Sequence, residues 1–426
     1  MLRLLKYLYK SKLLFSIVSF PMKLFDFMNF SKRDEIIFYG YHGRYNGNAK
    51  VLYEYYLTID NGLNPIWLLD NRDCNLDIDE NKSFILPSKI ASTLEHLKFL
   101  FKLHKARVIV VTSVGDLHIY RMLLWKKNHV EILLPHGISL KLNGIMAKHL
   151  EKEQKKIWLS IPKRFDMISV ASRIDKYSIS SGLSFDPNKI KIIGPQRRDV
   201  QSNLISLDKK LEIQKSILSN TNLNIKENEI NDYTFILYAP THRDHKKNSI
   251  ISTLLSNIDG FDMKKLNAFL EKNRIILFLR EHMESQNNLN NNESDLSSVR
   301  YLSQVDVPNI DYLLYGFDLL ITDYSSIYLD LIDYDISIAF IPYDLDEYEE
   351  KRGLTLAANT FFIGPSLLRQ EEFISYLENR KLIDKKYIEK RKYLTSLLFE
   401  IKVGESCKMT VKEINKLINL KESDNK

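Results

Sequence analysis

The sequence predicts an α/β protein built from two Rossmann-like doubly wound domains that face a central cleft, preceded by a basic amphipathic segment. Three observations lead to this prediction. Short apolar runs alternate with amphipathic helical patterns, and the alternation stops over one polar stretch and then restarts. The first 33 residues also carry seven basic side chains against one acidic one. Alternation of this kind is typical of parallel sheets that helices cover on both faces.

Length and composition agree with this class. A chain of 426 residues can form two or three domains, each with its own core. The hydrophobic share of 44% and the charged share of 27% are ordinary for a globular protein. The net charge of +7 is modest, so it does not indicate a nucleic acid partner.

The basic segment, residues 1–33, contains the apolar run LLFSIVSFPM. Ten residues are too few to cross a bilayer, which takes about 20. No small-residue cleavage site of a signal peptide follows the run. Two interpretations stay open: an amphipathic segment that lies on an anionic membrane surface, and an ordinary first helix packed on the domain.

The two cysteines, Cys74 and Cys407, lie far apart and form no Cys-x-x-Cys pair. They therefore predict neither a metal cluster nor a disulfide framework, and they suit a reducing cytosol. No hydrophobic stretch approaches transmembrane length, so we expect the catalytic part to be cytoplasmic.

The first domain is expected over residues 34–199. Amphipathic patterns such as NAKVLYEYYLTID and STLEHLKFLFKLHKA separate several of its apolar runs. The candidate strands are EIIFYG (35–40), PIWLL (65–69), SFILP (83–87), RVIVVTS (107–113), EILLP (131–135), DMISVA (166–171) and KIKIIG (189–194).

A polar stretch with one amphipathic helix, residues 200–231, is expected to be a linker. The second domain follows over residues 232–370, and residues 371–426 favour helices. The run QNNLNNNESD is predicted to be a surface loop. The candidate strands of the second domain are TFILYAP (234–240), RIILFLRE (274–281), VRYLS (299–303), FDLLITD (317–323) and SIAFIP (337–342).

Polar side chains gather directly after these strands, where a doubly wound fold builds its site. One polar strand end is expected by chance, but six that carry histidine and arginine so often indicate a ligand. The candidates are His136, Gly137, Pro195, Arg197, Arg198, Thr241, Arg243, His282, Asp323, Ser325, Ser326, Arg352 and Gly353.

The turn Thr-Asp-Tyr-Ser-Ser between a strand and a helical pattern has two interpretations. The hydroxyls of Ser325 and Ser326, with the free N–H groups of a first helical turn, could hold a phosphate. Asp323 or Ser325 could instead cap the helix. The charge of Asp323 would repel a phosphate, so this residue is expected to orient the loop or a neighbouring donor.

Each of the candidate histidines and arginines also has two possible roles, one functional and one structural. His136 precedes a glycine and could act as a general base near neutral pH, or it could bond a backbone carbonyl. His242 and His282 have the same alternatives. Arg243 and Arg352 could hold a phosphate with two hydrogen bonds each, or they could form surface salt bridges.

Several common motifs are absent from the sequence. It contains no G-x-x-x-x-G-K-[ST], no G-x-G-x-x-G and no G-x-S-x-G, which disfavours nucleotide-binding P-loops, dinucleotide folds and serine hydrolases. The triplets DID, DYD and DLD are too common in acidic turns to predict a metal site. We therefore assign no metal ligand.

Taken together, the motifs resemble the CDP-glycerol glycerophosphotransferase family, which includes teichoic acid primases and polymerases. The resemblance rests on an ordered set over residues 35–365: YHGRYNGNAKVLYEYY, LLPHGISLK, IIGPQRRD, LYAPTHRD, and TDYSSIYLD followed by PYDLDEYEEKRGL. It implies the two-domain fold of type-B glycosyltransferases, with an acceptor domain first and a donor domain second.

The resemblance also implies a reaction. An alditol phosphate, glycerol phosphate or ribitol phosphate, passes from its CDP-activated form to a hydroxyl of a lipid-linked primer or growing polymer, and CMP leaves. His136 is then the base, and His282, Arg243, Arg352 and the Ser325–Ser326 turn stabilise the charge on the phosphate. Thr241 and residues 195–199 contact the CDP part. No cofactor is tightly bound, although Mg²⁺ could accompany the phosphates without dedicated ligands.

The resemblance further implies a peripheral place on the cytoplasmic face of the bacterial membrane, because such acceptors lie there. Two alternatives remain. The protein could be a two-domain glycosyltransferase that uses a nucleotide sugar, or a non-catalytic protein that binds or assembles surface polysaccharide. Consumption of a nucleotide sugar in place of a CDP-alditol would favour the glycosyltransferase.

Overall fold

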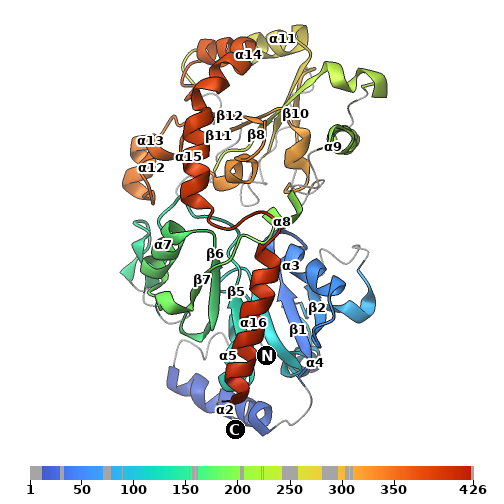
Figure 1. Ribbon diagram of the computed structural model, residues 1–426, viewed down its shortest axis with the longest axis vertical. Helices are drawn as coiled ribbons and strands as arrows, with labels where there is room; N and C mark the ends of the chain where they lie inside the picture. The colour runs from blue at the N-terminus through green and yellow to red at the C-terminus, as the bar shows by residue number, and fades with distance from the viewer. Residues whose placement is uncertain are drawn as a thin grey trace.

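The computed structural model describes residues 12–28, 33–70, 78–88, 90–152, 162–201, 206–221, 225–241, 258–280, 296–302 and 310–423, with a few isolated residues between these ranges. Two α/β domains lie one above the other, and the last helix runs back along the first domain (Figure 1). The predicted fold class of two doubly wound α/β domains is confirmed, whereas much of the predicted basic segment 1–33 lies outside the described residues.

The first sheet has seven strands in the order β3-β2-β1-β4-β5-β6-β7, and every pairing is parallel. Central strands such as β4 are buried on both faces, which explains their continuous apolar runs. The strands are β1 (Glu35–Tyr39), β2 (Asn64–Leu69), β3 (Ser83–Ile85), β4 (Ala106–Val111), β5 (Val130–Leu133), β6 (Met167–Val170) and β7 (Ile190–Ile192).

Helices cover both faces of this sheet. Ser92 and Glu95 form a reciprocal capping box that begins one of them, α4. The helices of this part are α3 (Gly47–Thr58), α4 (Thr93–His104), α5 (His118–Met122), α7 (Arg173–Leu183) and the short α8 (Arg198–Gln201).

The second sheet has five parallel strands in the order β10-β9-β8-β11-β12. All twelve predicted strands are thus confirmed. The strands are β8 (Thr234–Tyr238), β9 (Ile275–Leu279), β10 (Val299–Tyr301), β11 (Leu319–Thr322) and β12 (Ser337–Phe340). The helices around this sheet are α9 (Leu207–Asn220), α11 (Met263–Lys272), α12 (Leu345–Lys351), α13 (Ala358–Phe361), α14 (Gln370–Asp384) and α15 (Ile388–Leu398).

The stretch expected as a linker contributes a packed helix. Ile213 and Ile217 on α9 are fully buried in the core of the second domain. Gly316 lies directly against them, since a Cβ there would be 2.6 Å from Ile213 Cγ2. Helix α9 is therefore a structural part of the second domain, and most of its polar residues lie on its outer face.

The C-terminal helix α16 (Ser406–Ser423) returns to the first domain. The Asp199 carboxylate accepts hydrogen bonds from the backbone N–H groups of Gly404, Ser406 and Cys407, at 2.7–3.1 Å. Thr410 accepts a hydrogen bond from the buried Gln196 side chain at 2.8 Å. Residues 371–426 thus divide between the domains, because α14 and α15 stay with the second.

The N-terminal helix α2 (Lys12–Met28) docks through one buried carboxylate. Asp26 is 2.6 Å from His104 Nδ1 and 2.8 Å from His129 Nε2, and it accepts from the Trp125 N–H at 2.7 Å. Burial opposes ionisation, but the hydrogen bonds from the two histidines outweigh it and lower the pKa of Asp26. Across the described helices, none combines the length and apolarity that a bilayer span requires.

The topology fixes where ligands can bind. In a doubly wound sheet, the crevice lies at the carboxyl ends of the strands where the strand order reverses. The order reverses between β1 and β4 in the first sheet and between β8 and β11 in the second. Two such crevices, one in each domain, frame the candidate site.

Candidate active site

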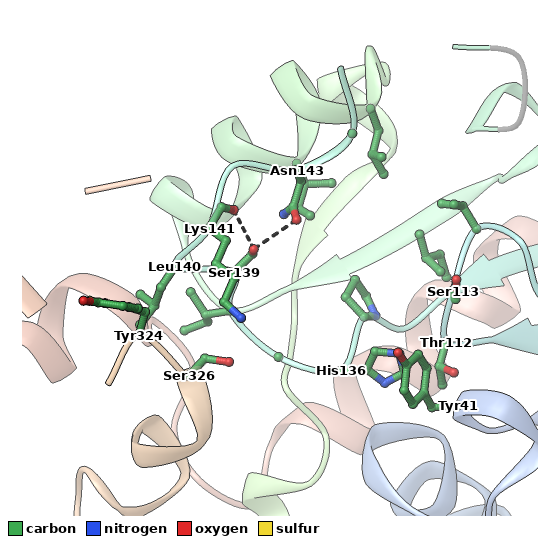
Figure 2. Close-up of a pocket in the computed structure, with 18 residues that line it drawn as sticks. Tyr41, Thr112, Ser113, His136, Ser139, Leu140, Lys141, Asn143, Tyr324 and Ser326 are labelled. Atoms are coloured by element: carbon green, nitrogen blue, oxygen red, sulfur yellow. Dashed lines mark hydrogen bonds between the residues drawn. The ribbon is translucent and has the colours of Figure 1, made fainter. Parts of the chain in front are cut away.

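A cavity of about 470 Å³ lies between the two domains. Its residues follow β1, β4 and β5 or lie on α7 in the first domain, and follow β11 in the second (Figure 2). The polar residues around it include Tyr41, Thr112, Ser113, His136, Lys141 and Ser326.

His136 stands directly after β5 and Pro135, and its side chain is exposed in the cavity. The imidazole packs against the Tyr41 ring, with 3.9 Å between the ring centroids and 67° between the planes. A base in this position can reach a substrate hydroxyl in the cavity. The role of His136 as the general base stays a prediction.

Gly137 lies close against the side chain of Arg197. A Cβ at this position would lie 2.8 Å from Nη2 of Arg197, closer than real contacts allow. The guanidinium of Arg197 thus supports the loop that carries His136.

Asn48, a residue that sequence analysis did not single out, holds the same loop. Its side chain is buried, and Nδ2 donates to the carbonyl oxygen of Pro135 at 2.5 Å. Its Oδ1 accepts from the backbone N–H of Arg197 at 3.1 Å. Asn48 therefore joins α3, the His136 loop and the segment after β7. Only its position in a motif of the resembled family could have pointed to it.

The Ser-rich turn follows β11, on the other side of the cavity. Asp323 is fully buried and accepts from the backbone N–H of Thr241 at 2.8 Å and of Tyr324 at 2.5 Å. It orients the turn, as the sequence suggested. Ser325 caps the following helix, because its Oγ accepts from the Ile327 N–H at 3.4 Å.

The helix that the pattern predicted after this turn, η12 (Ser326–Leu331), is a six-residue 3-10 helix. Ser326 lines the cavity, whereas Ser325 does not. The two interpretations of the turn thus concern different serines. Ser325 caps the helix, whereas Ser326 lines the cavity, and its contact with a phosphate stays a prediction.

Arg197 and Arg198 connect the domains. Nε and Nη2 of Arg197 donate to the two carboxylate oxygens of Asp330 at 2.7 and 2.9 Å. Arg198 pairs with Asp333 and lies over the Phe399 ring, 3.9 Å from its centroid. Pro195, at the start of this segment, is buried. Contact of all three residues with a CDP donor stays a prediction.

Arg352 and Gly353 also cross the interface. Nη1 of Arg352 donates to the Leu142 carbonyl at 2.7 Å, and the carbonyl of Gly353 accepts from the Leu142 N–H at 3.1 Å. Gly353 has a φ of +82°, in the left-handed region that favours glycine. Lys141 and Leu354 form an antiparallel bridge beside it. The donor-binding role of both residues stays a prediction.

Three predicted residues, His242, Arg243 and His282, lie outside the described residues. Arg280, at the carboxyl end of β9, is a basic side chain that sequence analysis passed over. It is buried and donates to the Val307 carbonyl at 2.8 Å. Burial and then the charge of Arg44, in the other domain, lower the pKa of Arg280 to about 10. The charges of Arg44 in the first domain and Arg280 in the second therefore lie close enough to repel each other.

No group of three or more His, Cys, Asp or Glu side chains suited to a metal ion occurs in the part of the chain that the structure describes. The cavity there offers hydroxyls, an imidazole and an ammonium group. These groups suit proton transfer and phosphate binding.

Two doubly wound domains with a histidine on one side of the cleft and a hydroxyl-bearing turn on the other are an arrangement that suits a two-domain group transferase. The chain belongs to the CDP-glycerol:poly(glycerophosphate) glycerophosphotransferase family, whose family model matches residues 21–416.

Relatives agree with this membership. The chain is 36% identical to the teichoic acid glycerol-phosphate primase of Bacillus subtilis over 164 residues, which is 38% of each protein. It is 24% identical to the teichoic acid poly(glycerol phosphate) polymerase of Bacillus spizizenii, over 81% of this chain and 83% of that protein. It is also 24% identical to the teichoic acid glycerol-phosphate transferase of Staphylococcus aureus, over 84% of this chain and 86% of that protein.

Solved structures show the same fold. The wall teichoic acid polymerase TagF superposes with a TM-score of 0.73 at 22% identity, over 97% of this chain and 98% of that one. A UDP-GlcNAc 2-epimerase from Neisseria meningitidis superposes with a TM-score of 0.55 at 12% identity, over 90% of this chain and 99% of that one.

Proposed function

We propose that this protein transfers glycerol phosphate from CDP-glycerol to a hydroxyl of a growing teichoic-acid-like or capsular polymer and releases CMP. The observation that carries the proposal is His136, exposed in the interdomain cavity of a chain that matches this family over residues 21–416. Relatives named as glycerol-phosphate primases and polymerases support the same reaction.

The chemistry follows from the cavity. His136 takes the proton of the acceptor hydroxyl, and the acceptor oxygen attacks the phosphorus that carries glycerol. A new oxygen–phosphorus bond forms, the bond to CMP breaks, and CMP leaves with the electron pair. The Ser326 hydroxyl, at the start of η12 on the opposite side, is placed to donate to the phosphate as its charge grows. Any Mg²⁺ would arrive with the donor's phosphates.

Ribitol phosphate is the second candidate group. The chain is 26% identical, over 153 residues, to the teichoic acid ribitol-phosphate polymerase of Staphylococcus aureus. The longer matches to glycerol-phosphate enzymes favour glycerol.

Donor choice tests the proposal. Purified full-length protein is offered CDP-glycerol, CDP-ribitol or a UDP-sugar, each with a short glycerol phosphate oligomer. We expect CMP release that needs both CDP-glycerol and the oligomer. Consumption of the UDP-sugar with no CMP from either CDP-alditol would move the protein to the glycosyltransferases.

We also propose that α2 rests on an anionic membrane surface at the cytoplasmic face. Its side chains Ile17, Phe20 and Phe27 are 55–62% exposed. Phe25 continues this apolar face onto α4, where its ring meets Phe101 at 5.4 Å. An amphipathic helix with an exposed apolar face binds lipid in this way. Its place at the far end of the first domain leaves the cleft free (Figure 1).

A further inference from the structure

The loop that carries His136 is anchored on both sides of that residue, and the two anchors lie in different domains. Just before His136, the carbonyl of Pro135 accepts a hydrogen bond from Asn48 of the first domain at 2.5 Å. After His136, the loop continues along the cavity to residues 139–142 (Figure 2). These residues lie against residues 352–355 of the second domain, a segment after α12 that we call the strap.

Backbone hydrogen bonds hold the loop against the strap. The N–H of Thr355 donates to the Leu140 carbonyl at 2.9 Å. The N–H of Leu142 donates to the Gly353 carbonyl at 3.1 Å, so that the two segments form an antiparallel bridge. Because such pairing fixes both the spacing and the register of two segments, the loop has to follow the strap when the domains move.

Thr355 also holds the loop through its side chain. The half-buried hydroxyl donates to the carbonyl of Ser139, three residues after His136, at 3.1 Å. From the first domain, the carboxyl group of Asp175 accepts from the N–H of the same Ser139. The two sides of this one peptide segment are therefore held by different domains.

The strap itself is fixed to the core of the second domain. The carbonyl of Tyr348, a buried residue of α12, accepts from the N–H of Gly353 at 3.2 Å. The Tyr348 ring stacks on that of Tyr324, with 4.3 Å between the centroids and 22° between the planes. Tyr324 lines the cavity in the turn after β11. Contacts thus run without interruption from this wall of the cavity, through the strap, to the loop of His136.

We infer that Thr355 is a positioning residue, which holds the loop of His136 from the second domain and so ties the place of the base to the arrangement of the two domains. The inference rests on the proposed transferase function and adds a residue that acts through His136. A small displacement of a base removes much of its effect, so loss of this anchor should lower kcat. A residue that contacted the donor would instead change the donor KM.

Steady-state CMP release tests the inference, with CDP-glycerol and a glycerol phosphate oligomer varied separately. Thr355→Val keeps the shape and the backbone N–H but removes the hydroxyl. We expect its kcat to fall about three- to tenfold, the effect of one lost hydrogen bond, with the donor KM unchanged. Thr355→Ser, which keeps the hydroxyl, should restore kcat.

Thr221 supplies the matched control, because it is also a half-buried threonine of the second domain. Its hydroxyl donates to the Ile217 carbonyl at 2.9 Å, and it does not line the cavity. Thr221→Val should lose a similar amount of melting temperature and keep its kcat. An equal loss of kcat in both valine variants, or a raised donor KM in Thr355→Val, would overturn the inference.

NMR of the His136 imidazole tests the same inference without enzymatic activity. In histidine-labelled protein, the signal that His136→Ala lacks belongs to this ring. The Tyr41 ring, 3.9 Å away between centroids, shifts that signal through its ring current, so a displaced loop changes the shift. We expect a changed signal in Thr355→Val but not in Thr355→Ser or Thr221→Val.

An unchanged His136 signal in Thr355→Val would overturn the positioning role. Wild-type protein that releases no CMP would instead overturn the transferase function, since the imidazole signal is read without substrate.

Discussion

Asn48 is the residue whose two hydrogen bonds set the position of His136. It is 3% exposed and bonds the carbonyl just before His136 and the N–H of Arg197. We expect Asn48→Ala to lower kcat about tenfold or more, because a small displacement of a base removes much of its effect. Stability should fall by about 1–3 kcal/mol. Thermal unfolding and CMP release measure the two effects.

The matched control is Gln214, a buried amide far from the cavity that donates to the Gly316 carbonyl at 3.0 Å. Gln214→Ala should lose similar stability and keep its kcat. Equal loss of activity in both variants, well below their melting temperatures, would show that Asn48 acts through stability alone.

Asp175 lies at the start of α7 and is buried. Burial raises its pKa to about 7, although N–H groups of Ala171 and Ser139 oppose the shift. The unfolded carboxyl titrates near 3.9. Between about pH 4 and 7 the folded state therefore holds a proton that the unfolded chain releases, so stability falls as pH rises, by at most about 4 kcal/mol.

We therefore expect the melting temperature of Asp175→Asn, relative to wild type, to be higher at pH 8 than at pH 5. The amide cannot ionise and escapes the cost of a buried charge. Parallel melting curves at the two pH values measure this difference. A constant difference would mean that Asp175 keeps an ordinary pKa.

At the scale of elements, α2 offers a direct test of membrane binding. Replacing Ile17 and Phe20 together by glutamate should lower binding to anionic vesicles about tenfold or more, since both side chains are exposed on the apolar face. CMP release on a soluble acceptor should not change. Co-sedimentation with vesicles measures binding.

Tyr177→Glu on α7 is the control, because this side chain is 65% exposed and α7 lies apart from α2 (Figure 1). It should bind vesicles as the wild type does. Similar loss of binding in both would mean that added negative charge, and not the α2 face, explains the effect.

The strands were predictable because buried parallel strands leave continuous apolar runs, as IIF in β1 and VIVV in β4 do. The packing of α9 was not predictable, since its buried residues Ile213 and Ile217 lie among polar residues in the sequence. The short 3-10 geometry of η12 was missed for a related reason. Its apolar residues Tyr328, Leu329 and Leu331 are buried at a spacing that also fits an α-helix.

At the scale of the whole molecule, contacts between the domains could not be read from the sequence. Arg197 and Asp330 are 133 positions apart, and an arginine after a strand has the same local pattern whether it faces a ligand or another domain. Of the candidates predicted at the strand ends, His136, Gly137 and Ser326 line the interdomain cavity, and their contacts with substrates stay predictions. Which of its arginines hold the domains together emerged only from the fold.

The Arg197–Asp330 pair predicts a measurable coupling. Asp330→Ala should lower both the melting temperature and CMP release, because it leaves a largely buried guanidinium unpaired beside Gly137. A double variant that combines Arg197→Asp with Asp330→Arg exchanges the two charges. Its melting temperature should recover part of what the single variants lose. If the double variant loses as much melting temperature as the two single variants lose together, the two residues do not act as an interdomain pair.

The most direct test of the central claim, that His136 is the base in the interdomain cleft, is acceptor-dependent CMP release from CDP-glycerol by wild type and His136→Ala. The variant should fold with an unchanged melting temperature and bind CDP-glycerol, while its rate falls about 10²- to 10⁴-fold. A folded His136→Ala protein that releases CMP at the wild-type rate would contradict the claim.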